Sequence, residues 1–373
     1  MSTVTAPARP SVASAPPESP PALGYVGPNW FAAVMGTGIV ANAAATLPFH
    51  VPGLLAAAAG IWVLDALLLV LLGVATALHW SRHREVARGH LAHPVMGNFY
   101  GAPAMALMTV GAGALLVGTP VVGQHAAVAV DAVLWTAGTL LGLVTAVVVP
   151  YLAFTSDGAE PDAAFGGWLM PVVPPMVSAA TGPLLLPHLP AGQWQLALQL
   201  ACTMMFGLTL LASLVLLTLL WGRLVQHALP AAAAVPTLWI VLGPLGQSVT
   251  ASHVLGGTAV DVLPAPYGTA FEAMGLVYGV PVWGFAMLWL ALAVAVTVRT
   301  ARRGLPFTLT WWSFTFPVGT VVTATSGLAA VTGADFLAVA AGLFYLALVA
   351  AWLVVATRTV RHLHDGRLLR PPA

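Results

Sequence analysis

The chain has 373 residues, of which 59% are hydrophobic and only 6% are charged. Soluble domains contain about 25% charged residues, so this composition indicates a membrane protein that crosses the bilayer several times. A net charge of +1 offers no basic surface for nucleic acid. The single cysteine, Cys202, excludes an intrachain disulfide. The absence of lysine excludes a Gly-x-x-x-x-Gly-Lys nucleotide loop, and with it ATP-driven pumping.

The composition divides the chain into three parts. Residues 1–24 are rich in proline, alanine and serine, which predicts a disordered cytoplasmic tail. This tail has no apolar core of the signal-peptide type, so we expect no cleavage and targeting by the first span. Residues 25–360 are predicted to form one transmembrane domain, and residues 361–373 a cytoplasmic C-terminal tail.

The fold class predicted for the central part is an all-α polytopic membrane protein. A span needs roughly 20 mainly apolar residues, and ten such segments occur. Their connections are short, so neighbouring spans should form five antiparallel hairpins. The predicted spans cover residues 28–47, 54–78, 94–118, 125–149, 166–187, 194–221, 236–256, 268–298, 307–332 and 335–357.

The placement of the arginines supports ten spans. With this number, every arginine falls on one side of the membrane, in the N-terminal tail or after spans two, six, eight and ten. The positive-inside rule then makes both termini cytoplasmic, in a plasma or inner cell membrane. An acidic loop at Asp157–Asp162 lies on the same side. The arginines are Arg9, Arg82, Arg84, Arg88, Arg223, Arg299, Arg302, Arg303, Arg358, Arg361, Arg367 and Arg370.

Residues that break helices fall mainly on the odd-numbered spans, and Pro281 in span eight is the exception. Within the membrane interior, non-helical backbone is tolerated only where it is buried in protein or lines a water-filled cavity. This predicts odd helices around a central pore and even helices in an outer, lipid-facing ring. The predicted pore-lining residues are Gly36, Thr37, Asn98, Phe99, Pro103, Pro174, Ser178, Gly243, Gln247, Ser248, Phe314 and Thr320.

The ninth span contains the motif Trp311-Trp312-Ser313-Phe314-Thr315-Phe316-Pro317. Pro317 lacks an N–H group, which predicts a bend in the helix. Phe316 precedes this bend and leads a small or hydroxylic helix face that includes Thr320 and Thr323. The pattern fits a pore wall with an aromatic plug. It equally fits a kinked helix with a packing seam of small residues.

Few ionisable side chains fall inside the predicted spans. Asp65 lies near the middle of span two, where its burial costs about 2.5–3.5 kcal/mol on insertion scales. It serves either as a hydrogen-bonded strut or as a proton-coupling group. His253, near the outer end of span seven, could titrate near neutral pH. Asp131 and Glu272 are placed in the first turns of spans four and eight, as structural or pore-mouth residues.

The eleven histidines raise haem or metal binding as an alternative function. Only His253 lies well within a span, and a single axial ligand cannot form a bis-histidine haem site. We therefore predict no metal, no cofactor and no enzymatic activity. A pore lined by hydroxyl groups, asparagine and freed backbone N–H groups would instead solvate an anion weakly. Weak binding suits conduction, because the ion must also leave.

Four motifs occur in the order found in a known family. They are Gly27-Pro28-Asn29-Trp30-Phe31 with Met35-Gly36-Thr37-Gly38, His93-Pro94 with Asn98-Phe99, Gly243-Pro244-Leu245-Gly246-Gln247-Ser248, and the motif of span nine. Residues 25–360 thereby resemble the tellurite-resistance/dicarboxylate transporter family. This family contains bacterial tellurite-resistance proteins, fungal malate permeases and sulfite exporters, and plant slow-type anion channels.

The resemblance implies five hairpins around a central pore, usually in a homotrimer with one pore per protomer. It also implies a phenylalanine gate, which falls on Phe316 because this residue directly precedes Pro317, with Phe314 as the competing assignment. We therefore expect an anion channel or facilitator for C4-dicarboxylates such as malate, or for small inorganic anions. The alternative is a proton-coupled exporter of malate, sulfite or tellurium oxyanions that uses Asp65, His253 or Glu272.

Overall fold

The computed structural model describes residues 23–156 and 163–369, and this part of the chain is helical without strands. Most of the predicted N-terminal tail, the acidic loop at residues 157–162 and residues 370–373 lie outside it. In the described part, eight helical stretches are long and apolar enough to cross a membrane. They are Leu54–Arg82, Met96–Val122, Gln124–Thr155, Gln193–Gln226, Ala232–Val262, Tyr267–Ala301, Leu309–Thr332 and Asp335–His364.

The two other predicted spans are shorter or broken. The first corresponds to the 3₁₀-helix η1 (Pro28–Trp30) and α1 (Phe31–Thr46), and the 16 residues of α1 extend about 24 Å at 1.5 Å per residue. The fifth is divided into η4 (Gly166–Leu169), α7 (Pro174–Thr181) and η5 (Gly182–His188). The membrane-spanning, all-α class is therefore confirmed for the described residues, whereas ten spans remain a prediction.

Continuous and interrupted helices alternate along the chain, as the proline and glycine pattern predicts. The continuous helices are α2 (Leu54–Arg82), α6 (Gln124–Thr155), α8 (Gln193–Gln226), α10 (Tyr267–Ala301) and α12 (Asp335–His364). The interrupted stretches are η2 (Met96–Tyr100) with α4 (Gly101–Gly113), the π-helix η3 (Ala114–Gly118) and α5 (Thr119–Val122); η6 (Ala232–Val241) with α9 (Leu242–Val262); and η7 (Leu309–Phe314) with α11 (Phe316–Thr332).

The break in the ninth span differs from the predicted bend. Pro317 does not kink a continuous helix but lies in the first turn of α11, where its missing N–H group costs no hydrogen bond. The chain changes direction at Thr315, between η7 and α11. This arrangement starts a new helix at Phe316.

Burial separates two groups of helices. Among the 18 consecutive residues that are most apolar in each of α2, α6, α8, α10 and α12, only 22–28% are buried. The corresponding share is 61–78% in the stretches that contain α4, α9 and α11. Helices α1 and α7 are buried along almost their whole length. We call α1, α4, α7, α9 and α11 the inner helices, and the continuous ones the outer helices.

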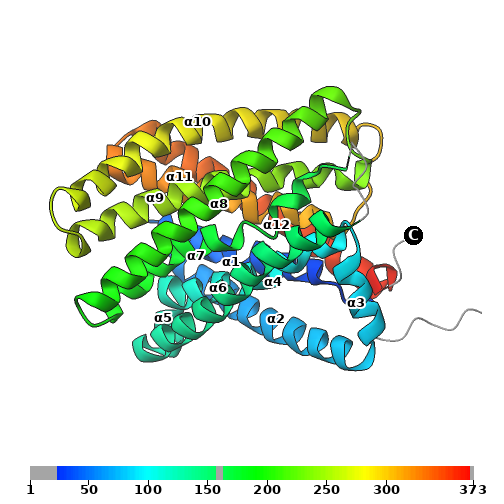
Figure 1. Ribbon diagram of the computed structural model, residues 1–373, viewed down its shortest axis with the longest axis horizontal. Helices are drawn as coiled ribbons and strands as arrows, with labels where there is room; N and C mark the ends of the chain where they lie inside the picture. The colour runs from blue at the N-terminus through cyan, green and yellow to red at the C-terminus, as the bar shows by residue number, and fades with distance from the viewer. Residues whose placement is uncertain (1–22, 157–162, 370–373) are drawn as a thin grey trace, which may run out of the picture.

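Each inner helix contacts two others of its group. Helix α1 packs on α4 and α11, α7 packs on α4 and α9, and α9 packs on α11. Each inner helix also packs on outer helices, most closely in the pairs α1–α2, α4–α6, α7–α8, α9–α10 and α11–α12. Each also contacts a second outer helix, as α7 does α6 and α9 does α8. Figure 1 shows α10 and α2 along opposite edges of the molecule, with α1, α4 and α7 between them.

A short helix that the sequence did not predict, α3 (Arg84–Ala92), follows α2. His79 at the end of α2 is buried, and its Nδ1 lies 2.8 Å from the carbonyl oxygen of Leu23. The ring of His79 also stacks on His90 of α3, with 5.4 Å between the ring centroids. These contacts fix the start of the described chain against α2 and α3.

We expect acid to loosen this anchor. Burial, followed by the charges of His79 and His93, lowers the pKa of His90 from its usual value of 6.5, so the fold favours the neutral ring. The stabilisation is present above the unfolded pKa and is lost as the pH falls through the lowered pKa of His90. Going from about pH 7 to about pH 5 should speed hydrogen exchange near Leu23, and His90→Gln should reduce this pH effect. An equal pH effect in both proteins would contradict the assignment.

Candidate functional site

A cavity of about 30 Å³ lies where all the inner helices meet. It has room for about one water molecule. No charged side chain belongs to its lining. The lining residues are Ala32, Met35, Phe99, Met105, Met170, Val173, Ile240, Gly243, Leu309, Trp312, Ser313, Phe316 and Pro317.

Every inner helix begins at or near this cavity. Most backbone N–H groups at these positions are already engaged, because 3₁₀ turns run directly into the α-helices: Phe31 N–H donates to the Pro28 carbonyl and Leu242 N–H to the Trp239 carbonyl. Helix α7 begins with two prolines, which have no N–H group. The cavity is therefore uncharged and offers few free backbone donors. The helix starts are Phe31 beside Ala32, Gly101 between Phe99 and Met105, Pro174 after Val173, Leu242 before Gly243, and Phe316 itself.

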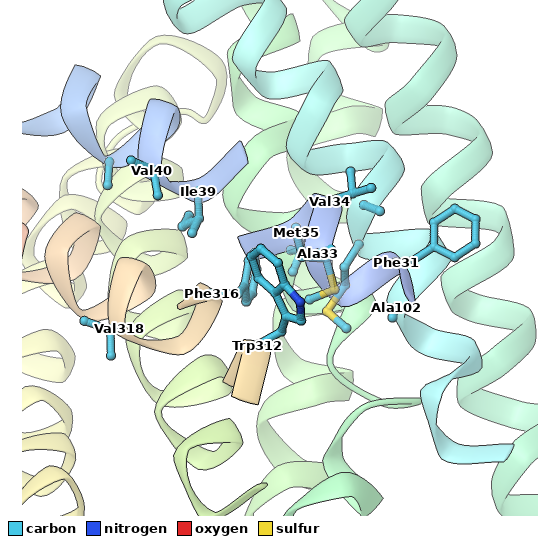
Figure 2. Packing of buried hydrophobic residues seen from close by; sticks show 14 of the residues in the cluster. Phe31, Ala33, Val34, Met35, Ile39, Val40, Ala102, Trp312, Phe316 and Val318 are labelled. Carbon is cyan, nitrogen blue, oxygen red and sulfur yellow. The ribbon is translucent and has the colours of Figure 1, made fainter. Parts of the chain in front are cut away.

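Phe316 is held in a closely packed setting. Its side chain is 5% exposed, and Figure 2 shows it with Trp312 beside Met35 of α1. The indole Nε1 of Trp312 donates a hydrogen bond of 3.1 Å to Thr359 Oγ1 on α12. Gly36 allows α1 to approach, because a Cβ atom there would lie 2.6 Å from the Trp312 ring. Gly36, which belongs to the first motif, thus allows α1 to pack closely beside Phe316 and Trp312.

The lining is less polar than the predicted one. Only Ser313 contributes a hydroxyl group, and three methionines, Met35, Met105 and Met170, supply much of the surface. An apolar constriction can close a pore by excluding water, and methionine adapts to irregular space. The sequence interpretation missed these methionines. Met35 directly precedes Gly36 and Met170 directly precedes Pro171, so the flanks of the backbone breaks could have identified them.

The cavity brings together Phe99 and Gly243, from the predicted pore lining, with Phe316, the predicted gate. Beside Gly243 there is open space, since no heavy atom lies within 4 Å of the position that a Cβ atom would take. Gln247 lies one helical turn further along α9 and is almost fully buried. The open space on this side of α9 therefore lies beside Gly243.

Several other predicted residues instead face neighbouring helices. The Thr37 hydroxyl accepts a hydrogen bond of 3.1 Å from Trp352 of α12. Pro174 packs on Gly142 of α6. Ser178 accepts a hydrogen bond of 2.9 Å from Thr139, also on α6. These side chains join inner helices to outer ones.

The remaining predicted residues bond to backbone close by. Thr320 Oγ1 lies 3.0 Å from the Leu242 carbonyl oxygen and thereby ties α11 to α9. Ser248 donates to the carbonyl of Leu245, one turn earlier on the same helix. The Asn98 amide donates to the Pro94 carbonyl at 2.7 Å. Pro103 is half-buried in α4.

Phe314, the competing gate residue, lies outside the cavity. Its ring meets Trp239 edge to face at 5.1 Å and Trp311 at 5.6 Å. Together they line an apolar groove of about 530 Å³ between α10 and α12. Phe314 therefore packs on the outer side of α11, whereas Phe316 lies on the cavity.

The titratable residues occupy different environments. Asp65 and Asp131 are fully buried, and no described residue donates a hydrogen bond to either carboxyl group. Neither Asp131 nor Glu272 lies in a first turn as predicted, because α6 already begins at Gln124 and α10 at Tyr267. Glu272 is exposed on α10, and His253 is half-buried with its ring against Gly327 of α11. No cluster of three histidine, cysteine or acidic residues suited to a metal occurs among the described residues.

The comparison with known proteins decides the family. The family profile described as voltage-dependent anion channel matches residues 25–360. The chain belongs to this family. It is 30% identical over 339 residues to the sulfite efflux pump SSU1 of Arthroderma otae, covering 89% of each chain. It is 29% identical over 346 residues to an uncharacterized transporter of Methanocaldococcus jannaschii, covering 92% of this chain and 95% of the relative.

A more distant relative is the sulfite efflux pump SSU1 of Candida albicans, 24% identical over 317 residues. The family predicted from the motifs is thereby confirmed. As a member of the voltage-dependent anion channel family, the protein is a multi-pass membrane channel or transporter for a small anion. This family consists of channels and transporters rather than enzymes.

Proposed function

We propose that this protein exports small inorganic oxyanions of the sulfite class through a central pore that Phe316 closes. The observation that carries the proposal is the cavity at Phe316, where the inner helices all begin. The uncharged, mainly apolar lining would keep the binding of an anion weak, which suits passage through a pore. The names of the relatives from Arthroderma otae and Candida albicans support sulfite.

The names of the relatives favour sulfite over the C4-dicarboxylates and tellurium oxyanions that the family resemblance also implies. A cavity of about 30 Å³ holds about one water molecule, so in this conformation the pathway is closed to sulfite and malate alike. Discrimination in a neutral pore depends on width and dehydration. Malate therefore stays the second substrate to compare.

We infer that α1 and the segment of residues 166–188 cross the membrane together with the eight long stretches. The inner helices then surround the pore and the outer helices face lipid, which agrees with their burial and contacts. Leu23 contacts His79 beside α3, and α3 and the C-terminal end lie at the same end of the molecule (Figure 1). By the positive-inside rule we place this end in the cytoplasm, at a plasma or inner membrane. From the resemblance we infer a homotrimer.

Reconstitution in liposomes tests the proposal. Sulfite, nitrate, chloride and malate should be compared in one preparation, and we expect sulfite to cross fastest. Protein-free liposomes provide the control for passive leakage. Faster malate than sulfite flux would reject the substrate assignment, and no flux of any of the four anions would reject the function.

A further inference from the structure

Asp65 lies in an unusual setting between three helices. Its side chain is fully buried on α2 and faces Gly38 of α1. A Cβ atom on Gly38 would overlap Asp65 Oδ2 and would lie 2.6 Å from Thr109 Cγ2 of α4. The carboxyl group therefore lies at the junction of α1, α2 and α4.

The hydrogen-bond donors around this junction are already engaged. Asn42 Nδ2 donates to the Thr109 carbonyl at 3.0 Å, and Trp62 Nε1 donates to the Val110 carbonyl at 2.9 Å. The Thr109 hydroxyl donates to the Met105 carbonyl. Neither oxygen of Asp65, nor Oδ1 of Asn42, accepts a hydrogen bond from any described residue. Three buried acceptor oxygens thus meet no donor.

No neighbouring charge neutralises the carboxyl group. Helices α1 and α4 and the π-helix Ala114–Gly118 contain no titratable side chain. The other buried carboxyl group, Asp131 of α6, faces Gly111. Gly111 follows Thr109 by two residues and so points to the other side of α4. An ionised Asp65 would be a buried charge without a partner, which is strongly unfavourable.

We propose that Asp65 is the proton-binding site of this transporter and that its protonation is coupled to anion export. A proton supplies the missing donor and removes the charge, so the neutral acid is the form that fits this packing. Loss of the proton requires α1 and α4 to part and admit water. Gly38 lies one helical turn from Met35, and Thr109 one turn from Met105, so this movement reaches the cavity lining.

Proton coupling deepens the proposed export function by naming its energy source. A transporter that expels sulfite against a gradient needs a driving force, and the sequence excludes a lysine-containing nucleotide loop. An inward proton gradient meets this need if Asp65 takes up a proton from one side and releases it to the other. The carboxyl group itself is only protonated and deprotonated.

Infrared spectroscopy of the purified protein tests the binding site without transport. A carboxylic acid C=O band assigned to Asp65 should be present at neutral pH, absent in Asp65→Asn and retained in the matched control Asp131→Asn. If Asp65→Asn folds poorly, titration of Asp131→Asn to alkaline pH provides the test, because Asp65 is then the remaining fully buried carboxyl group among the described residues. A band unchanged by Asp65→Asn, or an ionised Asp65 at neutral pH, would overturn the proposal.

Liposome flux tests the coupling. Sulfite export from wild-type vesicles should accelerate with an opposing proton gradient, and Asp65→Asn should lose this response while still passing sulfite. Protons that cross as part of bisulfite do so in both proteins. The difference between their responses to the proton gradient therefore measures the contribution of Asp65. A wild-type response in Asp65→Asn would overturn the coupling. Absence of sulfite flux in the wild type, with the infrared band present, would reject the export function but keep the proton site.

Discussion

Replacing Phe316 by alanine should raise the anion flux. The expected rise is about tenfold for each 1.4 kcal/mol that the ring adds to the free-energy barrier for anion passage. The ring lies on the cavity where the inner helices meet and is almost fully buried there. Its removal leaves a wider opening at the helix starts. The measurement is the initial rate of anion efflux from liposomes that contain equal amounts of folded protein.

Phe314→Ala is the matched control for the gate. The two phenylalanines are two residues apart, but Phe314 faces the outer groove with Trp239 and Trp311. Both variants lose the same ring. For buried Phe316 the change destabilises the protein by about 3–5 kcal/mol, and for half-buried Phe314 it costs less. The milder Phe316→Leu keeps the packing if the alanine variant folds poorly. Equal flux from folded Phe316→Ala and Phe314→Ala would remove the gate role from Phe316.

The second large effect is expected at Gly246 on α9. A Cβ atom there would lie 2.6 Å from the carbonyl carbon and 2.7 Å from the carbonyl oxygen of Thr320. Because these are backbone atoms of α11, the helices would have to separate. Gly246→Ala should therefore destabilise the fold by about 1–3 kcal/mol, the usual cost of overpacking. Thermal unfolding in detergent measures the change.

Gly243→Ala separates packing from conduction on the same helix. No heavy atom lies within 4 Å of its Cβ position, so the variant should keep the wild-type melting temperature. Its new methyl group would project into the cavity and slow anion flux. If Gly243→Ala unfolds as readily as Gly246→Ala, the open space beside Gly243 is wrongly assigned.

The sequence predicted the features that depend on backbone chemistry. Proline and glycine placement distinguished the interrupted from the continuous stretches, because broken helices need burial that plain Leu/Val/Ala helices do not. The motif around Pro317 led to Phe316, which does line the cavity. The break itself took another form: a 3₁₀-helix ends at Phe314 and a new α-helix begins at Phe316.

Side-chain direction could not be predicted in the same way. Thr37 and Ser178 were chosen because hydroxyl groups suit a pore, yet both bond to outer helices. In a membrane, hydroxyl groups also serve as links between helices, and residue type does not distinguish the two uses. The apolar cavity lining was not predicted for the same reason: residue type does not distinguish Met35 and Met105 from ordinary core residues.

The inner helices all run in the same direction along the pore, and this affects the electrical potential that an anion meets there. Their dipoles all point the same way along the pore, and the positive ends lie where the helical stretches begin, at Pro28, Met96, Gly166, Ala232 and Leu309. An anion that approaches from this end reaches the most favourable potential early, whereas one from the opposite end must first pass along the helices. At equal anion concentrations and zero voltage the two one-way fluxes are equal, but the asymmetric potential makes the anion currents at equal and opposite voltages unequal. The pathway then acts as a rectifier whose polarity is built into the backbone.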